Sequence, residues 1–183
     1  NFSSELPVLI FSTEGRTIPQ DVPAGGQRAK GSLVVFDTIQ GRSSLRDPPH
    51  FLGLADFEIF GQTSAGWLKK PHNIEIQDEL GNDKAVSLLG MPAEADWKVR
   101  NPFSDKFLMG DFLGHELFEK MGHYSLRRKY VEVFLDSGGG KLTYPGDYYG
   151  VLVLIERIER GKDRVDIAEL TASHTNEPAI TGG

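Results

Sequence analysis

The stretch from Phe57 to Asp78 constrains the fold most, because each of its two halves alternates apolar and polar residues. Phe57 and Ile59 in the first half, and Ile74 and Ile76 in the second, recur at a period of two. That period places apolar side chains on one face of a strand. The stretch therefore predicts a β-hairpin, and the rest of the chain must supply a sheet that covers its apolar face.

The turn of this predicted hairpin is a candidate anion site. Two glycines bracket a short polar run, and a lysine pair follows: Gly61, Gln62, Thr63, Ser64, Gly66, Lys69 and Lys70. Exposed backbone N–H groups, hydroxyls and an ammonium group suit phosphate oxygens. The same residues are also typical of a solvated strand end. Neighbouring strand residues face opposite ways, so only one of the two lysines can point into a cleft.

Composition excludes several classes of function. The chain has 183 residues, a net charge of −6 and no cysteine. An acidic chain lacks the basic footprint of non-specific nucleic-acid binding, so no nucleic-acid partner is expected. Without cysteine there is no disulfide scaffold, thiol nucleophile or cysteine metal site. The longest apolar run, Val151 to Ile155, suits a buried strand and is far too short to span a membrane.

Other segments predict further strands and one helix. The expected strands are Leu6 to Phe11, Ser32 to Asp37, Lys129 to Asp136 and Tyr148 to Ile158, with Ala85 to Leu89 as a shorter extended segment. A helix is expected to begin at Ser104 as N-cap and to end at Gly122, since Leu113, Leu117 and Met121 recur at intervals of four. This order predicts an α+β fold, in which a mostly antiparallel or mixed sheet has one helix packed on its face.

Other catalytic motifs are weak. The five histidines have no metal-ligand spacing, and His72 beside the lysine pair is interpreted as a strand surface residue. The run from Gly138 to Lys141 lacks the glycine spacing and the Ser or Thr of a phosphate-binding P-loop. A carbohydrate-binding β domain would need exposed aromatic residues, and the two tryptophans, Trp67 and Trp97, are a poor signal for one.

A series of short motifs resembles the spore coat protein H (CotH) kinase family in order and spacing over most of Leu6 to Gly183. The motifs are Gly61-Gln62-Thr63-Ser64, Leu68-Lys69-Lys70, His72 to Ile76, Leu88 to Pro92, Asp96-Trp97, Asn101 to Lys106, Glu116-Leu117, Met121-Gly122, Tyr130 to Leu135, Gly150-Val151 and Glu156-Arg157-Ile158. The resemblance implies an atypical protein-kinase-like N-terminal lobe over residues 51–183. A strand-rich extension, residues 1–50, is expected to precede it.

The resemblance also implies an activity and a partial site. The activity is ATP-dependent phosphotransfer, with Mg²⁺ or Mn²⁺, to Ser or Thr of a surface or coat protein. In a kinase-like lobe, a hairpin covers the phosphates, a lysine contacts them and a helix glutamate orients the lysine. By resemblance these are the turn Gly61 to Gly66, Lys70 or Lys69, and Glu116 or Glu119. Glu156 is expected on the ribose or adenine side.

Two departures from the family pattern open an alternative. Phe60-Gly61 stands where the family usually has Arg-Gly, and Gly110-Asp111 stands where it usually has Arg-Asn. Loss of both arginines favours weak nucleotide binding, or a catalytically inactive secreted or cell-surface binding and assembly module. The chain is expected to be an N-terminal fragment, with the catalytic acids beyond Gly183 and no activity alone. Its location is expected to be extracytoplasmic: secreted, at the cell surface or in a spore coat.

Overall fold

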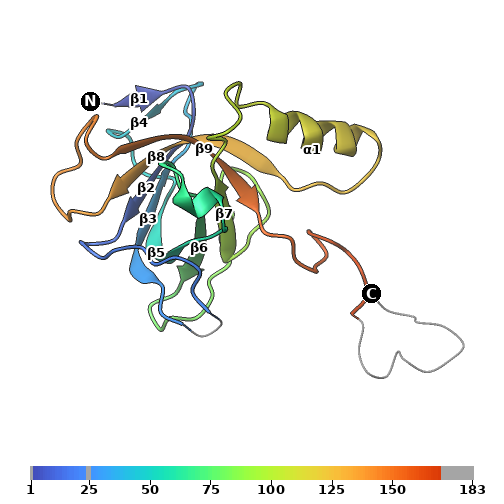
Figure 1. The fold of residues 1–183 in the computed structure, drawn as a ribbon, viewed down its shortest axis with the longest axis horizontal. Coiled ribbons are helices and arrows are strands. Elements are labelled where there is room, and N and C mark those ends of the chain that lie inside the picture. Colours follow the sequence, from blue (N-terminus) through green and yellow to red (C-terminus); the bar gives the residue numbers. More distant parts are fainter. Residues whose placement is uncertain (1, 24–25, 170–183) are drawn as a thin grey trace, which may run out of the picture.

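Seven strands form one closed ring in the computed structural model, which describes residues 2–23 and 26–169 (Figure 1). In order around the ring they are β2 (Val8–Ser12), β3 (Ala29–Phe36), β5 (Phe51–Ile59), β6 (His72–Gln77), β7 (Asp96–Arg100), β9 (Tyr148–Glu156) and β8 (Arg128–Asp136). The short strands β1 (Ser3–Ser4) and β4 (Ser43–Ser44) form a separate pair. The helices are the 3₁₀ turn η1 (Ser64–Gly66) and α1 (Gly110–Lys120).

The barrel closes through one parallel pairing. Strand β2 pairs antiparallel with β3 and parallel with β8, from Val8 opposite Glu132 to Ser12 opposite Asp136. All other neighbouring strands in the ring are antiparallel. The prediction of a kinase-like α+β lobe, with a mostly antiparallel sheet and one packed helix, is therefore wrong, since the protein is mostly β and its sheet is a closed barrel. The reason is long-range pairing: β2 and β3 join β8 to β5, and local patterns do not report such contacts.

Alternation along the strands fills the interior. In β5 and β6, Phe57, Ile74 and Ile76 are fully buried, as the hairpin pattern predicted. The ring of Phe57 stacks on that of Phe11 from β2, with centroids 5.0 Å apart. Strand β7, which the pattern analysis did not single out, contributes Trp97 to the same core. The segment expected as a strand at residues 85–89 makes only an isolated bridge, between Val86 and Glu94.

Helix α1 lies at the periphery of the barrel (Figure 1) and differs from its predicted form. It begins at Gly110 rather than after Ser104, because the Asp105 carboxylate accepts hydrogen bonds from the backbone N–H groups of Phe107 and Gly110 and so holds the preceding residues in turns. Its end was predicted correctly, since Gly122 has φ +86°. The helix contacts the barrel through two ion pairs and one ring stack, but no residue of α1 is buried. No helix among the described residues is long and apolar enough to cross a bilayer.

The packing of the core predicts that substitutions at two positions of β5 should differ in their effect on stability. Phe57 is fully buried, whereas Leu54 on the same strand is 49% exposed. Phe57→Ala should lower the free energy of unfolding by about 3–5 kcal/mol, because it leaves a cavity among packed rings. Leu54→Ala, the matched control, should cost less than about 1 kcal/mol. Urea denaturation of both variants measures the difference, and equal losses would contradict the described packing.

Candidate functional site

The loop that joins β5 to β6, residues 60–71, has a defined conformation. Gly61 has φ +93°, and a Cβ on it would clash with the Ser64 hydroxyl, so both backbone and space require glycine there. Ser64 begins the 3₁₀ turn, which places Ala65 in the interior. Gln62 and Thr63 remain exposed. The loop therefore presents its polar tip to solvent from a fixed base.

Side chains from distant parts of the chain fix the lysine segment. The backbone N–H of Lys70 donates to the hydroxyl of Tyr149, at the start of β9. The same hydroxyl donates to the carbonyl of Leu68 at 3.4 Å. The side-chain amide of Asn101, just after β7, donates to the carbonyl of Lys69. Polar contacts thus hold three consecutive residues, Leu68 to Lys70, before any ligand arrives.

The two lysine side chains lie in different surroundings. Lys69 lies over β9, where a side chain at Gly150 would collide with its ammonium group. It also lines a cavity of about 270 Å³ together with Phe103 and Lys106. Lys70 acts instead on His72, since its charge helps to lower the pKa of that imidazole. Both lysines are half-buried.

A second cavity adjoins the loop and reaches the start of α1. It has a volume of about 310 Å³, and its lining includes Phe60, Ser64 and Trp67 from the loop, and Arg100 and Gly110. The Trp67 ring packs against Phe103 with centroids 5.8 Å apart. The Arg100 guanidinium pairs with Asp111 of α1 at 3.0 Å. Aromatic faces and a cation therefore lie together beside the predicted phosphate turn.

His72 is a core residue, and its interpretation as a surface residue is wrong. It is 1% exposed and lies between the rings of Phe11 and Tyr149. Burial first, and the charge of Lys70 second, lower its pKa from 6.5 to about 4. The period of two that puts Ile74 and Ile76 inside also puts His72 inside, so the signal was present in the sequence.

The predicted helix carboxylates do not meet the lysines of the loop. Glu116 is exposed and forms its described ion pair with Lys120, one turn further along α1, at 3.1 Å. Glu119, the alternative, pairs with Arg128 at the start of β8 at 2.9 Å. Assignment of either carboxylate to lysine orientation stays a prediction.

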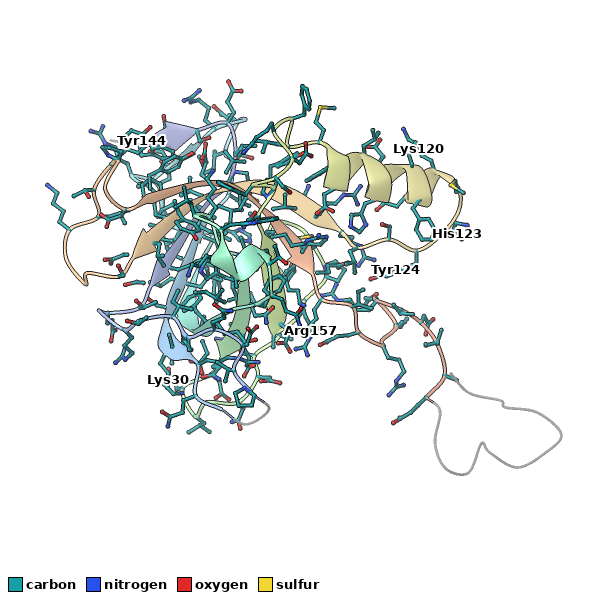
Figure 2. The ribbon with its side chains drawn as sticks, in the orientation of Figure 1. Lys30, Lys120, His123, Tyr124, Tyr144 and Arg157 are labelled. Carbon is teal, nitrogen blue, oxygen red and sulfur yellow. The ribbon has the colours of Figure 1, made fainter. Side chains whose placement is uncertain are left out.

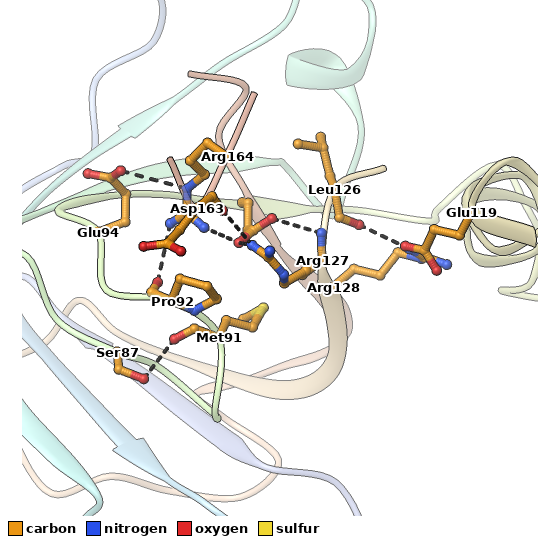
Figure 3. A network of polar contacts seen from close by, with 11 residues as sticks. Ser87, Met91, Pro92, Glu94, Glu119, Leu126, Arg127, Arg128, Asp163 and Arg164 are labelled. Carbon is orange, nitrogen blue, oxygen red and sulfur yellow. Dashed lines mark hydrogen bonds and ion pairs between the residues drawn. The ribbon is translucent and has the colours of Figure 1, made fainter. Parts of the chain in front are cut away.

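Glu156, at the end of β9, lies in a buried ionic network. Figure 3 shows two members of this network, Arg127 and Arg164. Glu156 is fully buried, and its carboxylate accepts from the Arg127 guanidinium at 2.7 Å and from the Arg127 backbone N–H at 2.9 Å. Arg164 also donates to this carboxylate and reaches the carbonyl of Pro92 at 3.3 Å. Arg127 further donates to the carbonyl of Asp163. Glu156 thus ties the segment after β9 to the barrel, and its predicted contact with a nucleotide remains a prediction.

Three carboxylates that adjoin this network resemble a metal-ligand group. Oxygens of Glu94, Asp96 and Glu159 lie within 4.8 Å of one another. Burial, and then the charges of Glu94 and Asp96, raise the pKa of Glu159. Arg157, however, pairs with Asp96 at 2.8 Å and with Glu159 at 3.3 Å, while Arg164 lies 3.7 Å from Glu94. The cluster is therefore explained by ion pairs to arginine.

Sequence reasoning missed the residues that support the loop and the network. Tyr149 and Asn101 act on residues 79 and 32 positions away, respectively. Arg127 and Arg164 approach Glu156 from 29 and 8 positions away. Of these four residues, only Asn101 could have been found from the sequence, because it lies in one of the family motifs. The others act by tertiary contact that no local pattern reports.

Comparison with known proteins gives one family. A family model described as CotH kinase protein matches residues 57–176, or 120 of the 183 residues. The match begins in β5 and runs through β9, so it includes the loop, its supports and α1. No curated protein matches the chain.

The buried network around Glu156 predicts that two Glu→Ala substitutions should differ in their effect on stability. Glu156→Ala should lower the free energy of unfolding by about 3–5 kcal/mol, because it leaves two arginines next to a buried site without their carboxylate. Glu14→Ala removes an exposed partner of Arg16 and should cost at most about 1 kcal/mol. Urea denaturation at neutral pH measures both, and a loss below 1 kcal/mol at Glu156 would contradict its described role.

The lowered pKa of His72 predicts acid sensitivity. The unfolded chain protonates this histidine near pH 6.5, whereas the folded chain does so only near pH 4. The unfolded state therefore binds the proton more tightly, and the free energy of unfolding falls as the pH falls between these values. From about pH 7.5 to about pH 5, wild type should lose about 2 kcal/mol more than His72→Phe. The exposed control His50→Asn should follow wild type, and identical pH profiles for all three would refute the assignment.

Proposed function

Because the chain belongs to the CotH kinase protein family, we propose that it serves ATP-dependent phosphotransfer to Ser or Thr residues of a protein. The family match is the observation that carries this proposal. Within the match, the loop between β5 and β6 is the segment whose chemistry best suits a nucleotide. The proposal extends to a protein substrate of a cell surface or spore coat, and to an extracytoplasmic location.

The loop residues fit the phosphate end of a nucleotide. Lys69 and Lys70 supply positive charge, and Thr63 and Ser64 supply hydroxyls beside the Gly61 turn. Because Tyr149 and Asn101 already hold the lysine backbone, little backbone conformational entropy remains to be lost on binding. When bound, ATP supplies the phosphoryl group that is transferred. One of the two lysines and the loop bind and orient its phosphates.

The described carboxylates do not fit a divalent cation at this loop. The one group of three, Glu94, Asp96 and Glu159, is paired with Arg157 and Arg164, and Asp96 lies at the opposite end of β7 from Arg100. We therefore derive no step through Mg²⁺ or Mn²⁺ in this part of the chain. In the proposal, the cation enters with ATP as its counterion.

A catalytically inactive binding or assembly module is the second candidate function. The observation that favours it is the loss of two family arginines, at Phe60 and Gly110, which both line the cavity beside the loop. The structure supplies two other cations nearby: the Lys98 ammonium lies 4.6 Å from the centroid of the Phe60 ring, and Arg100 lines the same cavity. Direct measurement of nucleotide binding separates the two functions.

Thermal unfolding of the full chain with and without Mg-ATP tests the proposal. At a hundredfold excess over the dissociation constant, binding to the native state adds about 2.7 kcal/mol. For a chain of this size, that should raise the Tm by about 5–10 °C. One of the two variants Lys69→Ala and Lys70→Ala should abolish most of the increase, because only one of these side chains can point into the nucleotide cleft.

Two controls make the titration specific. Lys84→Ala changes an exposed lysine in the turn after β6 and should keep the full increase in Tm. MgCl₂ without nucleotide should give none. Absence of any increase with Mg²⁺ or Mn²⁺ nucleotide would refute nucleotide binding by this chain and favour the inactive binding module.

A further inference from the structure

Helix α1 contacts the barrel through its polar and aromatic face. Asp111 pairs with Arg100 at 3.0 Å, and Glu119, two turns later, pairs with Arg128 at 2.9 Å. Between them, the Phe112 ring stacks on Tyr130 with centroids 3.9 Å apart. Asp111 and Glu119 are eight residues apart, so they lie on one side of the helix. This arrangement is the opposite of the usual one, in which a surface helix turns its apolar stripe toward the core.

The apolar stripe of α1 consequently faces away from the barrel. Met109, Leu113, Leu117 and Met121 recur every four residues and are 59%, 52%, 52% and 70% exposed. This spacing aligns them along one side of the helix. A solvated helix would carry polar residues there, and an aligned row of exposed large apolar residues is typical of a protein interface.

Charged side chains next to the stripe indicate which partner it binds. Glu116 and Lys120, next to the stripe, are paired with each other, and their side chains are 52% and 71% exposed. Figure 2 shows Lys120 on the side of α1 away from the barrel. On the other border, a side chain added at Gly114 would meet nothing within 4 Å, so a second helix can approach closely. One border of the stripe thus carries both a negative and a positive side chain.

We propose that this face binds the same face of a second copy of the chain, with the two α1 helices antiparallel. Two-fold symmetry makes such a contact self-complementary, since residue i meets j and residue j meets i. In an antiparallel pair centred on Phe118, midway between Glu116 and Lys120, Glu116 of each copy lies level with Lys120 of the other copy, and like charges lie about 6 Å apart along the axis. Opposite charges then face each other on both sides of the two-fold axis. This interface is independent of the proposed phosphotransfer.

Sedimentation equilibrium of the full chain tests the interface. Wild type should show a reversible monomer–dimer equilibrium, and Leu117→Glu should raise the dimer Kd at least about tenfold by placing a charge in the stripe. Leu80→Glu changes an equally apolar residue that is 87% exposed in another loop, and it should leave the dimer Kd unchanged. A strictly monomeric wild type at concentrations up to about 500 µM would overturn the proposal.

A charge exchange tests the antiparallel pairing itself. Glu116→Lys makes the charged border of each copy wholly positive, and Lys120→Glu makes it wholly negative, so each single variant should weaken the dimer several-fold at low salt. The double variant restores opposite charges across the interface and should return to within about twofold of wild type. Additive weakening in the double variant would overturn the proposed symmetry, as would dimerisation that Leu117→Glu does not affect. Circular dichroism confirms that each variant keeps its fold.

Discussion

The parallel pairing of β2 with β8 is the constraint on which the rest of the structure depends. It gives β2 a hydrogen-bonded neighbour on each side, so the seven-strand sheet has no open edge. Closure brings Phe11 of β2 onto Phe57 of β5 and completes the core. The loop of residues 60–71 and the network around Glu156 both take contacts from neighbouring strands, since Tyr149 of β9 holds the loop and Arg127, just before β8, reaches Glu156. Both sites therefore depend on contacts between strands as well as on their own segments.

The local sequence pattern predicted the strands whose own residues alternate or form an apolar run. The hairpin of β5 and β6, and the strands β8 and β9, alternate or run apolar long enough to be recognised. Strand β7 was missed because Asp96–Arg100 is short and carries three charged residues, although Trp97 and Val99 point inward. Ring closure was missed for a different reason. Pairing between β2 and β8 joins residues more than one hundred positions apart, and no period in either strand identifies its neighbour.

The residues of the candidate site were likewise only partly predictable from the sequence. Gly61, Lys69 and Lys70 follow one another in the chain, so the sequence placed them in one turn, and the structure keeps them in one loop. Their supports, Tyr149 and Asn101, come from other strands and could not be assigned without the fold. Glu156 has an apolar run before it that predicts a buried strand end, yet its two arginine partners look like ordinary surface charges in sequence.

Periodicity identifies the apolar face of a helix but not what covers it. In α1 the ion pairs of Asp111 and Glu119 hold the opposite face to the barrel, so the apolar stripe stays exposed while the fold remains closed. Gly110, the first residue of this helix, lines the same cavity as Ser64 of the loop. The Arg100–Asp111 pair, whose two residues line this cavity, joins the end of β7 to α1. The position of α1 and the shape of the candidate nucleotide site therefore rest on shared contacts, so a change in one alters the surroundings of the other.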